Sequence, residues 1–283
     1  MLTRESRATS PAMRTFVAKA LGTAAVLLAG ICAVDAAEAT LAGVPLKPGG
    51  ITQAHVPIDG QLRSYVSEGG NPVPDHAVAV LAVPPNFDPQ RSWPVLVALS
   101  TSDFQRKNRD DLRDFYMQPA LQEGWLVLAG DGEGNPPRDT AGWRAGMTLA
   151  ALDALHRSFP GSNKWPIAVA GFSGGAKRAG NLAPLLARAG NRLMGIFLTG
   201  VNEDRLTQGY QTFRPGSGFL RTPIYISAGQ EDRVARIGDQ QNVKRTLDRT
   251  GFTNVRVVTM PHGHAVSRSA VREALRWFRE QNG

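Results

Sequence analysis

The spacing of apolar residues predicts that strands and helices alternate from about residue 93 to the end of the chain. Trp93–Leu99 is a nearly continuous apolar run, as expected for a strand that is buried on both faces. The segment 143–159 instead repeats its apolar residues at helical spacing, with Met147, Leu152 and Leu155 on one stripe. By the same criteria, strands are predicted at Trp125–Ala129, Ile167–Ala170, Met194–Leu198, Ile224–Ser227 and Val255–Met260, and helices at 110–123, 174–189, 238–249 and 267–280. This alternation predicts an α/β fold with a mostly parallel central sheet and helices on both faces.

The segment before residue 93 has a different pattern. Ile51–Pro57 and Leu62–Val66 flank the turn-forming pair Asp59-Gly60, which predicts an antiparallel β-hairpin at the start of the sheet. His76–Val83 alternates toward a further strand. About twenty residues separate the strands that end near Thr199 and begin near Pro223, so no large helical lid is expected.

The first forty residues show neither the strand nor the helix patterns of the rest of the chain. Basic residues between Arg4 and Lys19 precede the apolar run Ala20–Val34, and an Ala-Glu-Ala sequence ends at Ala39. This order is typical of a secretory signal peptide, so we predict that residues 1–39 are a leader and 40–283 one domain exported to the periplasm or the extracellular space. The apolar run is too short to span a bilayer comfortably, and we expect no stable membrane anchor. The alternative is a buried N-terminal helix.

Composition restricts the chemistry. Cys32 is the only cysteine and lies in the predicted leader, so the domain has no disulfide, thiol nucleophile or cysteine-based metal site. The chain carries a formal charge of +8, with basic residues spread from Arg63 to Arg279. Because they form no long run and are not interleaved with aromatic residues, we interpret them as a solvated surface and expect no nucleic-acid partner.

One stretch combines a strand with a reactive side chain. The predicted strand Ile167–Ala170 leads into Gly171-Phe172-Ser173-Gly174-Gly175 and then into an Ala- and Leu-rich helix. A serine on such a sharp turn projects its hydroxyl above the sheet, beside the free N–H groups of the helix N-terminus. The structural alternative is a glycine-rich turn without chemistry. Asp232 and His264 also follow predicted strands, so all three side chains are expected at the carboxyl edge of the sheet, where ligands bind in such folds.

Serine needs a base to accept its proton, and a carboxylate commonly holds that base in place. Ser173, Asp232 and His264 occur in the order that α/β-hydrolases use. From about Ile51 to Phe278 the sequence resembles these enzymes, in particular small secreted esterases of the dienelactone-hydrolase, feruloyl-esterase and polyhydroxyalkanoate-depolymerase type. The matching motifs are the Gly171–Gly175 turn, Gly229-Gln230-Glu231-Asp232, and Pro261-His262-Gly263-His264.

The resemblance implies a choice among neighbouring candidates. The family places its base after a glycine, which favours His264 over His262, and its Gly-x-x-Asp spacing favours Asp232 over Glu231. Asp204 is the other candidate for the acid. Two histidines at i, i+2 with no third ligand nearby make a poor zinc site, so no metal and no cofactor are expected. Structural roles are expected for His55 and His156, and a surface-turn position for His76.

The resemblance also implies an oxyanion hole made of two backbone N–H groups. Gly174 supplies the first, and alignment places Ser102 at the second, with Thr101 the next candidate. The sequence departs from the family here, because Ser100-Thr101 stands where a His-Gly pair is usual. Asp131 and Glu133 lie on a loop at the same edge, and we expect them to be solvated.

These features predict a secreted serine hydrolase that cleaves small-molecule or polymeric carboxylic esters through a Ser173–His264–Asp232 triad and an acyl-enzyme. A peptidase or an acyltransferase could use the same groups, and a binding protein could keep the fold without activity. Neither the acyl or alcohol specificity nor the oligomeric state follows from the sequence.

Overall fold

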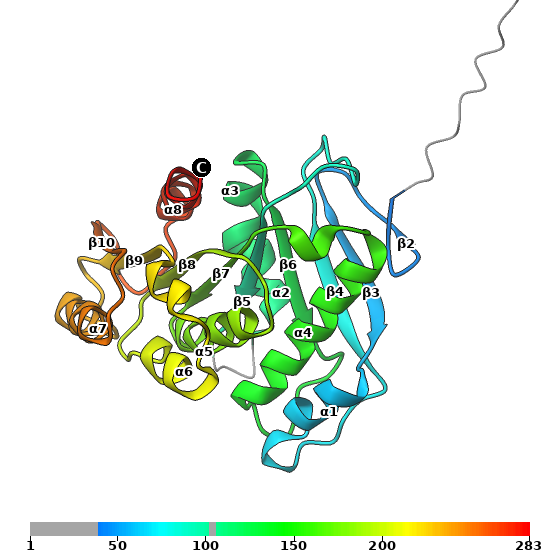
Figure 1. Cartoon of the computed structure of the whole chain (residues 1–283), viewed down its shortest axis with the longest axis horizontal. Coiled ribbons are helices and arrows are strands. Elements are labelled where there is room, and N and C mark those ends of the chain that lie inside the picture. The colour runs from blue at the N-terminus through cyan, green and yellow to red at the C-terminus, as the bar shows by residue number, and fades with distance from the viewer. Residues whose placement is uncertain (1–38, 102–105) are drawn as a thin grey trace, which may run out of the picture. The chain divides into compact units, whose positions relative to one another are not determined.

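The computed structural model of the chain describes residues 39–101 and 106–283 (Figure 1). The chain divides into two units, Met1–Ala37 and Glu38–Gly283, and the predicted leader lies outside the described residues except for Ala39. In the described part, an eight-stranded sheet has the order β10-β9-β8-β7-β5-β6-β4-β3. Its strands are β3 (Ile51–Pro57), β4 (His76–Ala82), β5 (Val95–Leu99), β6 (Leu126–Asp131), β7 (Ile167–Phe172), β8 (Leu193–Thr199), β9 (Ile224–Gly229) and β10 (Val255–Met260).

The strands from β6 to β10 along this order pair in parallel, as predicted, whereas β4 is antiparallel to both β3 and β6. The parallel strand β5 is buried throughout and β7 is buried at every residue before Phe172, because helices cover both faces of the sheet. A separate antiparallel pair, β1 (Thr40–Leu41) and β2 (Val44–Pro45), precedes the sheet.

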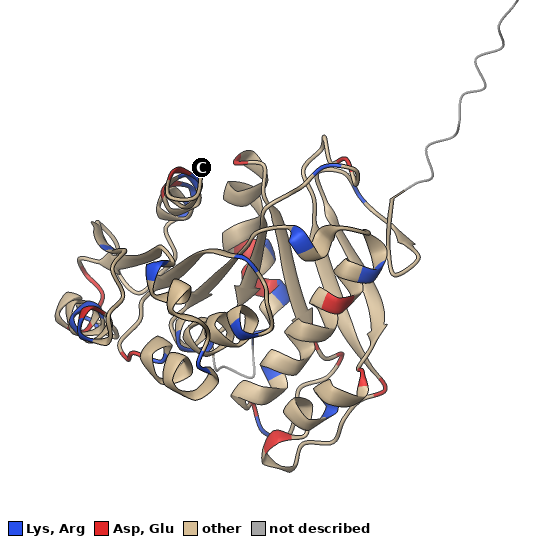
Figure 2. Cartoon of the chain, viewed as in Figure 1, with Lys and Arg blue, Asp and Glu red and all other residues tan. Residues whose placement is uncertain are grey.

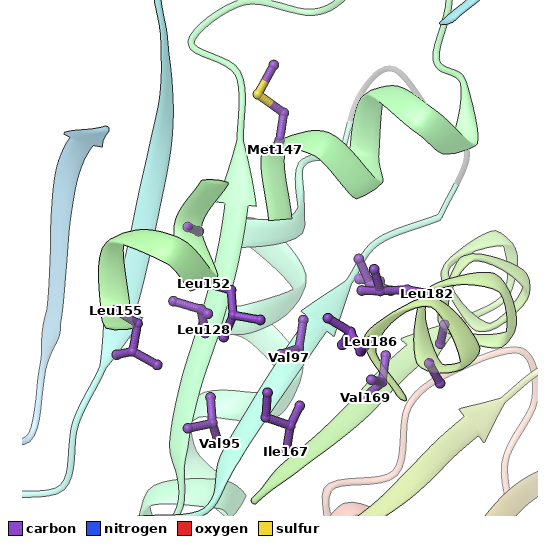
Figure 3. Close-up of a cluster of buried hydrophobic side chains, with 14 of the residues drawn as sticks. Val95, Val97, Leu128, Met147, Leu152, Leu155, Ile167, Val169, Leu182 and Leu186 are labelled. Carbon is purple, nitrogen blue, oxygen red and sulfur yellow. The ribbon is translucent and has the colours of Figure 1, made fainter. Parts of the chain in front are cut away.

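Helices cover both faces of the sheet. They are α1 (Gly60–Val66), α2 (Asn108–Asp111), α3 (Met117–Gln122), α4 (Ala141–Ser158), α5 (Gly174–Arg188), α6 (Leu206–Phe213), α7 (Ile237–Thr250) and α8 (Arg268–Glu280). Side chains from α1, α4, α5 and α7 share one buried apolar cluster, and those from α3 and α8 share the cluster on the opposite face. Figure 3 shows α4 and α5 meeting the sheet, with Leu152 beside Leu128 and Leu186 beside Val97 and Val169. A π-helical turn, Leu112–Tyr116, joins α2 to α3 where the sequence predicts one continuous helix.

One part of the predicted hairpin is wrong. Leu62–Val66 lies within the helix α1 and forms no strand, and the antiparallel partner of β3 is β4. Leu62 and Val66 are both buried, and their i, i+4 spacing places them on the same face of a helix. That face packs on α4, where Gly146 leaves room for the Val66 side chain. Tertiary packing therefore determines the conformation of a segment whose short pattern also fits a strand.

The last helix completes the core on its face of the sheet. Phe278 of α8 is fully buried and lies against Gly195 of β8, at the place where any larger residue would put its Cβ atom. A Cβ atom on Gly195 would come within 2.3 Å of the Phe278 ring, so strand and helix approach each other more closely than side chains would permit. The segment between β8 and β9 holds only α6 and a short 3₁₀ turn, consistent with the absence of a large lid.

Candidate active site

Ser173 occupies a sharp turn between β7 and α5, as the sequence predicts. Its backbone has φ 55° and ψ −118°, a conformation that costs a non-glycine residue free energy and persists only when the surroundings enforce it. The flanking glycines permit this turn. A Cβ atom on Gly171 would lie 2.1 Å from the Gly175 carbonyl oxygen, and one on Gly175 would lie 2.2 Å from that of Leu99. The motif therefore allows backbone to pack closely on backbone around the Ser173 side chain.

Three side chains from separate loops form a hydrogen-bonded chain at this turn. The His264 Nε2 atom lies 3.0 Å from Ser173 Oγ, and His264 Nδ1 lies 2.8 Å from Asp232 Oδ2. Because a carboxylate can only accept, His264 donates its Nδ1–H to Asp232 and its Nε2 accepts the Ser173 hydroxyl proton. The structure thus brings together the serine, histidine and aspartate that the sequence singles out, although 91 residues separate Ser173 from His264.

Asp232 is fixed from both sides. Its other oxygen, Oδ1, accepts the backbone N–H groups of Val234 and Ala235, each at 2.8 Å. Burial by itself would raise the pKa of Asp232, but the hydrogen bonds from His264 and from these two backbone groups outweigh it and hold the pKa below its usual value. The carboxylate is therefore ionised near neutral pH and remains an acceptor for His264.

The competing candidates lie elsewhere. The Asp204 Oδ1 atom accepts the N–H groups of Leu206 and Thr207, so this carboxylate caps α6. The Glu231 side chain is exposed, and its backbone N–H donates to the carbonyl of His262. The His262 Nδ1 atom lies 2.7 Å from the Gly263 carbonyl oxygen, an arrangement that shapes the loop rather than reaching Ser173.

The loop after β5 is held by two buried arginines that the sequence analysis did not identify. Arg178 donates through Nη1 to the carbonyl oxygens of Ser100 (3.1 Å) and Thr101 (2.8 Å). Arg144 donates to Ser100 Oγ at 3.1 Å and to the Arg106 carbonyl at 3.0 Å. The two arginines thus hydrogen-bond to the backbone or side chains on both sides of residues 102–105. The predicted oxyanion donor Ser102 is one of those residues and lies outside the described part of the chain.

Asp139 forms ion pairs with both of these arginines. Its carboxylate lies 2.8 Å from Arg144 Nε and 2.9 Å from Arg178 Nη2. Burial would raise the pKa of Asp139, but the two guanidinium groups outweigh it and lower the pKa below its ordinary value. Burial, reinforced by the charge of Arg144, lowers the pKa of Arg178. With a side chain 8% exposed, Arg178 sits where one turn of α5 meets the loop, five residues after Ser173.

The other predicted donor, Gly174, is the first residue of α5. Backbone N–H groups in the first turn of a helix have no acceptor within the helix, so they remain available to an anion placed there. Phe172, between Gly171 and Ser173, packs its ring 4.7 Å from the His264 ring and 6.0 Å from Phe115. These aromatic contacts restrict how the His264 ring can move.

Comparison with solved structures identifies the architecture. The Pyrococcus furiosus esterase Pf2001 superposes with a TM-score of 0.52 at 16% identity, over 81% of this chain and 92% of that one. A ferulic acid esterase gives 0.56 at 12% identity, over 82% and 98%. A Rhizomucor miehei esterase gives 0.53 at 12% identity, over 84% and 85%. The chain has the α/β-hydrolase fold. No protein-family model and no curated protein matches the sequence.

Within the α/β-hydrolase fold, the expectation for Asp131 is wrong. Its side chain is only 2% exposed. It accepts the backbone N–H groups of Asn108 and Arg109, each at 2.9 Å, and lies 3.7 Å from Arg144. Burial, only partly offset by these hydrogen bonds, raises its pKa. Asp131 therefore anchors the start of α2 and is not a solvated loop charge. His76 was expected in a surface turn, but it is the first residue of β4.

The sequence does carry a signal for the buried position of Arg178. Arg178, Leu182 and Leu186 follow one another at intervals of four on the buried side of α5, so a charged residue occupies a position where the pattern calls for an apolar one.

Among the described residues, one group places metal-binding atoms together, namely His55, His76 and Glu133. No helix in the described part of this α/β-hydrolase fold is both long and apolar enough to cross a bilayer.

Proposed function

We propose that the protein is a serine hydrolase that cleaves carboxylic esters. The observation that carries the proposal is the hydrogen-bonded order Ser173–His264–Asp232 at a turn whose serine is held at φ 55°. The fold shared with esterases of known structure supports it. In this proposal, Ser173 attacks the acyl carbon while His264 Nε2 accepts its proton and then returns it to the leaving alcohol. Asp232 keeps His264 in the tautomer that presents a bare Nε2 to the hydroxyl.

The second half of the reaction uses the same groups. Water takes the place of the alcohol, His264 accepts its proton, and the attack on the acyl-enzyme releases the acid and regenerates Ser173. The negative oxygen that forms in each step would be stabilised by the N–H of Gly174 and by a second N–H at Ser102. Arg144 and Arg178 hydrogen-bond to Ser100, which precedes that second donor in the chain. No step calls for a cofactor.

A labelling experiment tests the proposal against a binding protein of the same fold. A fluorophosphonate probe should label the wild-type chain and not the Ser173→Ala variant, with the exposed Ser217→Ala as the matched control that keeps labelling. Absence of labelling in the wild type, on protein that hydrolyses no ester, would favour the binding-protein alternative. Comparing acyl esters of graded length with matching amides separates an esterase from a peptidase, and adding an alcohol as acceptor reveals an acyltransferase.

We propose further that residues 1–39 direct export and are then removed. The support is the order of basic residues, apolar run and small residues before Thr40. Intact-mass measurement of protein recovered from the exported fraction should give a chain that begins near Thr40. Exported protein that still begins at Met1 would contradict this prediction.

A further inference from the structure

The two antiparallel pairings of β4 place three potential metal ligands on one face of the sheet. Between β3 and β4, Pro57 stands opposite His76, and His55 lies two residues earlier on the same face of β3. Between β4 and β6, Val78 stands opposite Asp131, so continuation of the register brings Glu133 level with His76. Because side chains two residues apart in a strand share a face, His55, His76 and Glu133 converge on the same side of the sheet.

The side-chain geometry matches this register. Glu133 Oε1 lies 3.0 Å from His55 Nε2 and 3.3 Å from His76 Nε2, and the three ligand atoms all lie within 4.8 Å of one another. The imidazole rings stack with centroids 4.2 Å apart. His76 Nε2 is shielded from solvent, and its contact with Glu133 lacks the alignment of a hydrogen bond; it makes no other hydrogen bond within the described residues. A buried ring nitrogen is normally paired in an aligned hydrogen bond, so the poor alignment leaves it free to bind an ion placed between it and the carboxylate.

These distances suit a metal ion of the zinc type. Zinc binds imidazole nitrogen and carboxylate oxygen at about 2.0–2.2 Å, so neighbouring ligand atoms in a tetrahedral site lie about 3.3 Å apart. Two histidines and one carboxylate leave further coordination positions for water, since the His55 and Glu133 side chains are 60% and 59% exposed. We propose that His55, His76 and Glu133 bind a divalent transition-metal ion, for which zinc is the probe of choice. Imidazole ligands select against magnesium and calcium.

The surroundings hold the loop that carries Glu133. Lys107 donates through Nζ to the carbonyl oxygens of Gly132 and Glu133, which fixes the backbone and leaves the carboxylate to the histidines. A hollow of about 430 Å³ borders the site, with His76 and Glu133 in its wall beside Pro74 and Trp143. The site lies at the carboxyl edge of the sheet, three strand spacings or roughly 15 Å from β7, and is separate from Ser173.

A bound ion would join β3, β4 and the β6–α4 loop. The proposal is tested on the chain prepared without a polyhistidine tag and dialysed against a chelator. Zinc titration by calorimetry should show one ion bound per chain with micromolar or tighter affinity. A hundredfold excess of zinc over the dissociation constant should raise the unfolding temperature by about 5–10 °C, because only the folded chain assembles the site. Calcium and magnesium should produce neither effect.

Three single variants, His55→Gln, His76→Gln and Glu133→Gln, should each weaken zinc binding at least tenfold. His156→Gln, on the half-buried side of α4 and outside the cluster, is the matched control and should bind as the wild type does. Unfolding temperatures measured in chelator should agree among all variants, which separates loss of a ligand from loss of the fold. A variant that fails this check is replaced by His→Asn or Glu→Ala at the same position. No binding at 100 μM zinc, or binding that survives the His76→Gln/Glu133→Gln double variant, would overturn the proposal.

Discussion

The two sides of the proposed active site are built in different ways. On the nucleophile side, backbone geometry fixes Ser173 through its turn and Asp232 through the two N–H groups that it accepts, and His264 bridges the two. On the oxyanion side, the loop after β5 is held by guanidinium groups from two helices, across separations of 38 to 78 residues. The comparison indicates that local backbone positions Ser173 and Asp232, whereas the loop around the developing charge depends on distant side chains. Variants on each side should therefore differ in kind as well as in size.

The largest expected effect is on the nucleophile side. Ser173→Ala removes the attacking oxygen but keeps a Cβ atom at the strained turn. We expect ester turnover to fall on the order of 10⁴-fold or more, with thermal unfolding unchanged, since members of a triad act as a unit. Rate and unfolding should be measured on one preparation. Loss of the folded state would instead show that Ser173 is structural, and retention of most of the rate would exclude it as the nucleophile.

The two histidines of one loop make the second test. His264→Ala removes the group that bridges Ser173 and Asp232, so turnover should fall about as far as in Ser173→Ala. His262→Ala removes only a contact to the Gly263 carbonyl, and a measurable fraction of the turnover should remain. Steady-state ester hydrolysis of the pair decides the assignment, and the reverse ranking would overturn it.

A smaller effect is expected on the oxyanion side. Arg178→Met releases the Ser100 and Thr101 carbonyls, and a displaced donor loop should lower kcat about 10- to 100-fold. The KM should change little, because the lost interaction acts on the transition state. The buried Asp139 also loses one partner, so the assay belongs well below the unfolding temperature of the variant.

Arg178→Lys is the matched control for this variant. It keeps the charge near Asp139 but cannot reach both carbonyls with a planar fork, so only part of kcat should return. A change confined to stability, with kcat unaltered in both variants, would show that Arg178 serves the fold alone.

The smallest effect on turnover is expected at Asp204, which belongs to neither side. Asp204→Ala removes the cap of α6 and should lower the free energy of unfolding by about 1 kcal/mol. Ester turnover should stay within twofold of the wild type. Denaturant unfolding and a rate assay measure the two quantities, and a large loss of turnover would transfer the role of the acid from Asp232 to Asp204.

The contrast between local backbone geometry and distant side-chain contacts also explains which features can be predicted from the sequence. The strand–turn–helix at Ser173 and the loops ending at Asp232 and His264 carry local patterns, and the parallel order of the sheet follows from their alternation. The α1 helix was missed because its five-residue pattern fits a strand equally well and only its packing on α4 settles the conformation.

Long-range side-chain contacts were beyond local reasoning. Arg144 and Arg178 are remote in sequence from the loop that they hold, and Asp131 looked like a loop charge because its partners precede it by more than twenty residues. The basic residues, by contrast, are distributed over many elements (Figure 2). The expectation that they bind no nucleic acid stays a prediction.

The burial of Phe278 against Gly195 has a consequence for the order in which the protein is made. During synthesis, β8 emerges long before the helix that closes over it, and a chain ending before His264 has Ser173 and Asp232 but no base. Such a chain also exposes the apolar face that α8 later covers. The proposed activity therefore requires the C-terminal residues, and a nascent chain that has not yet reached His264 lacks the base for the reaction.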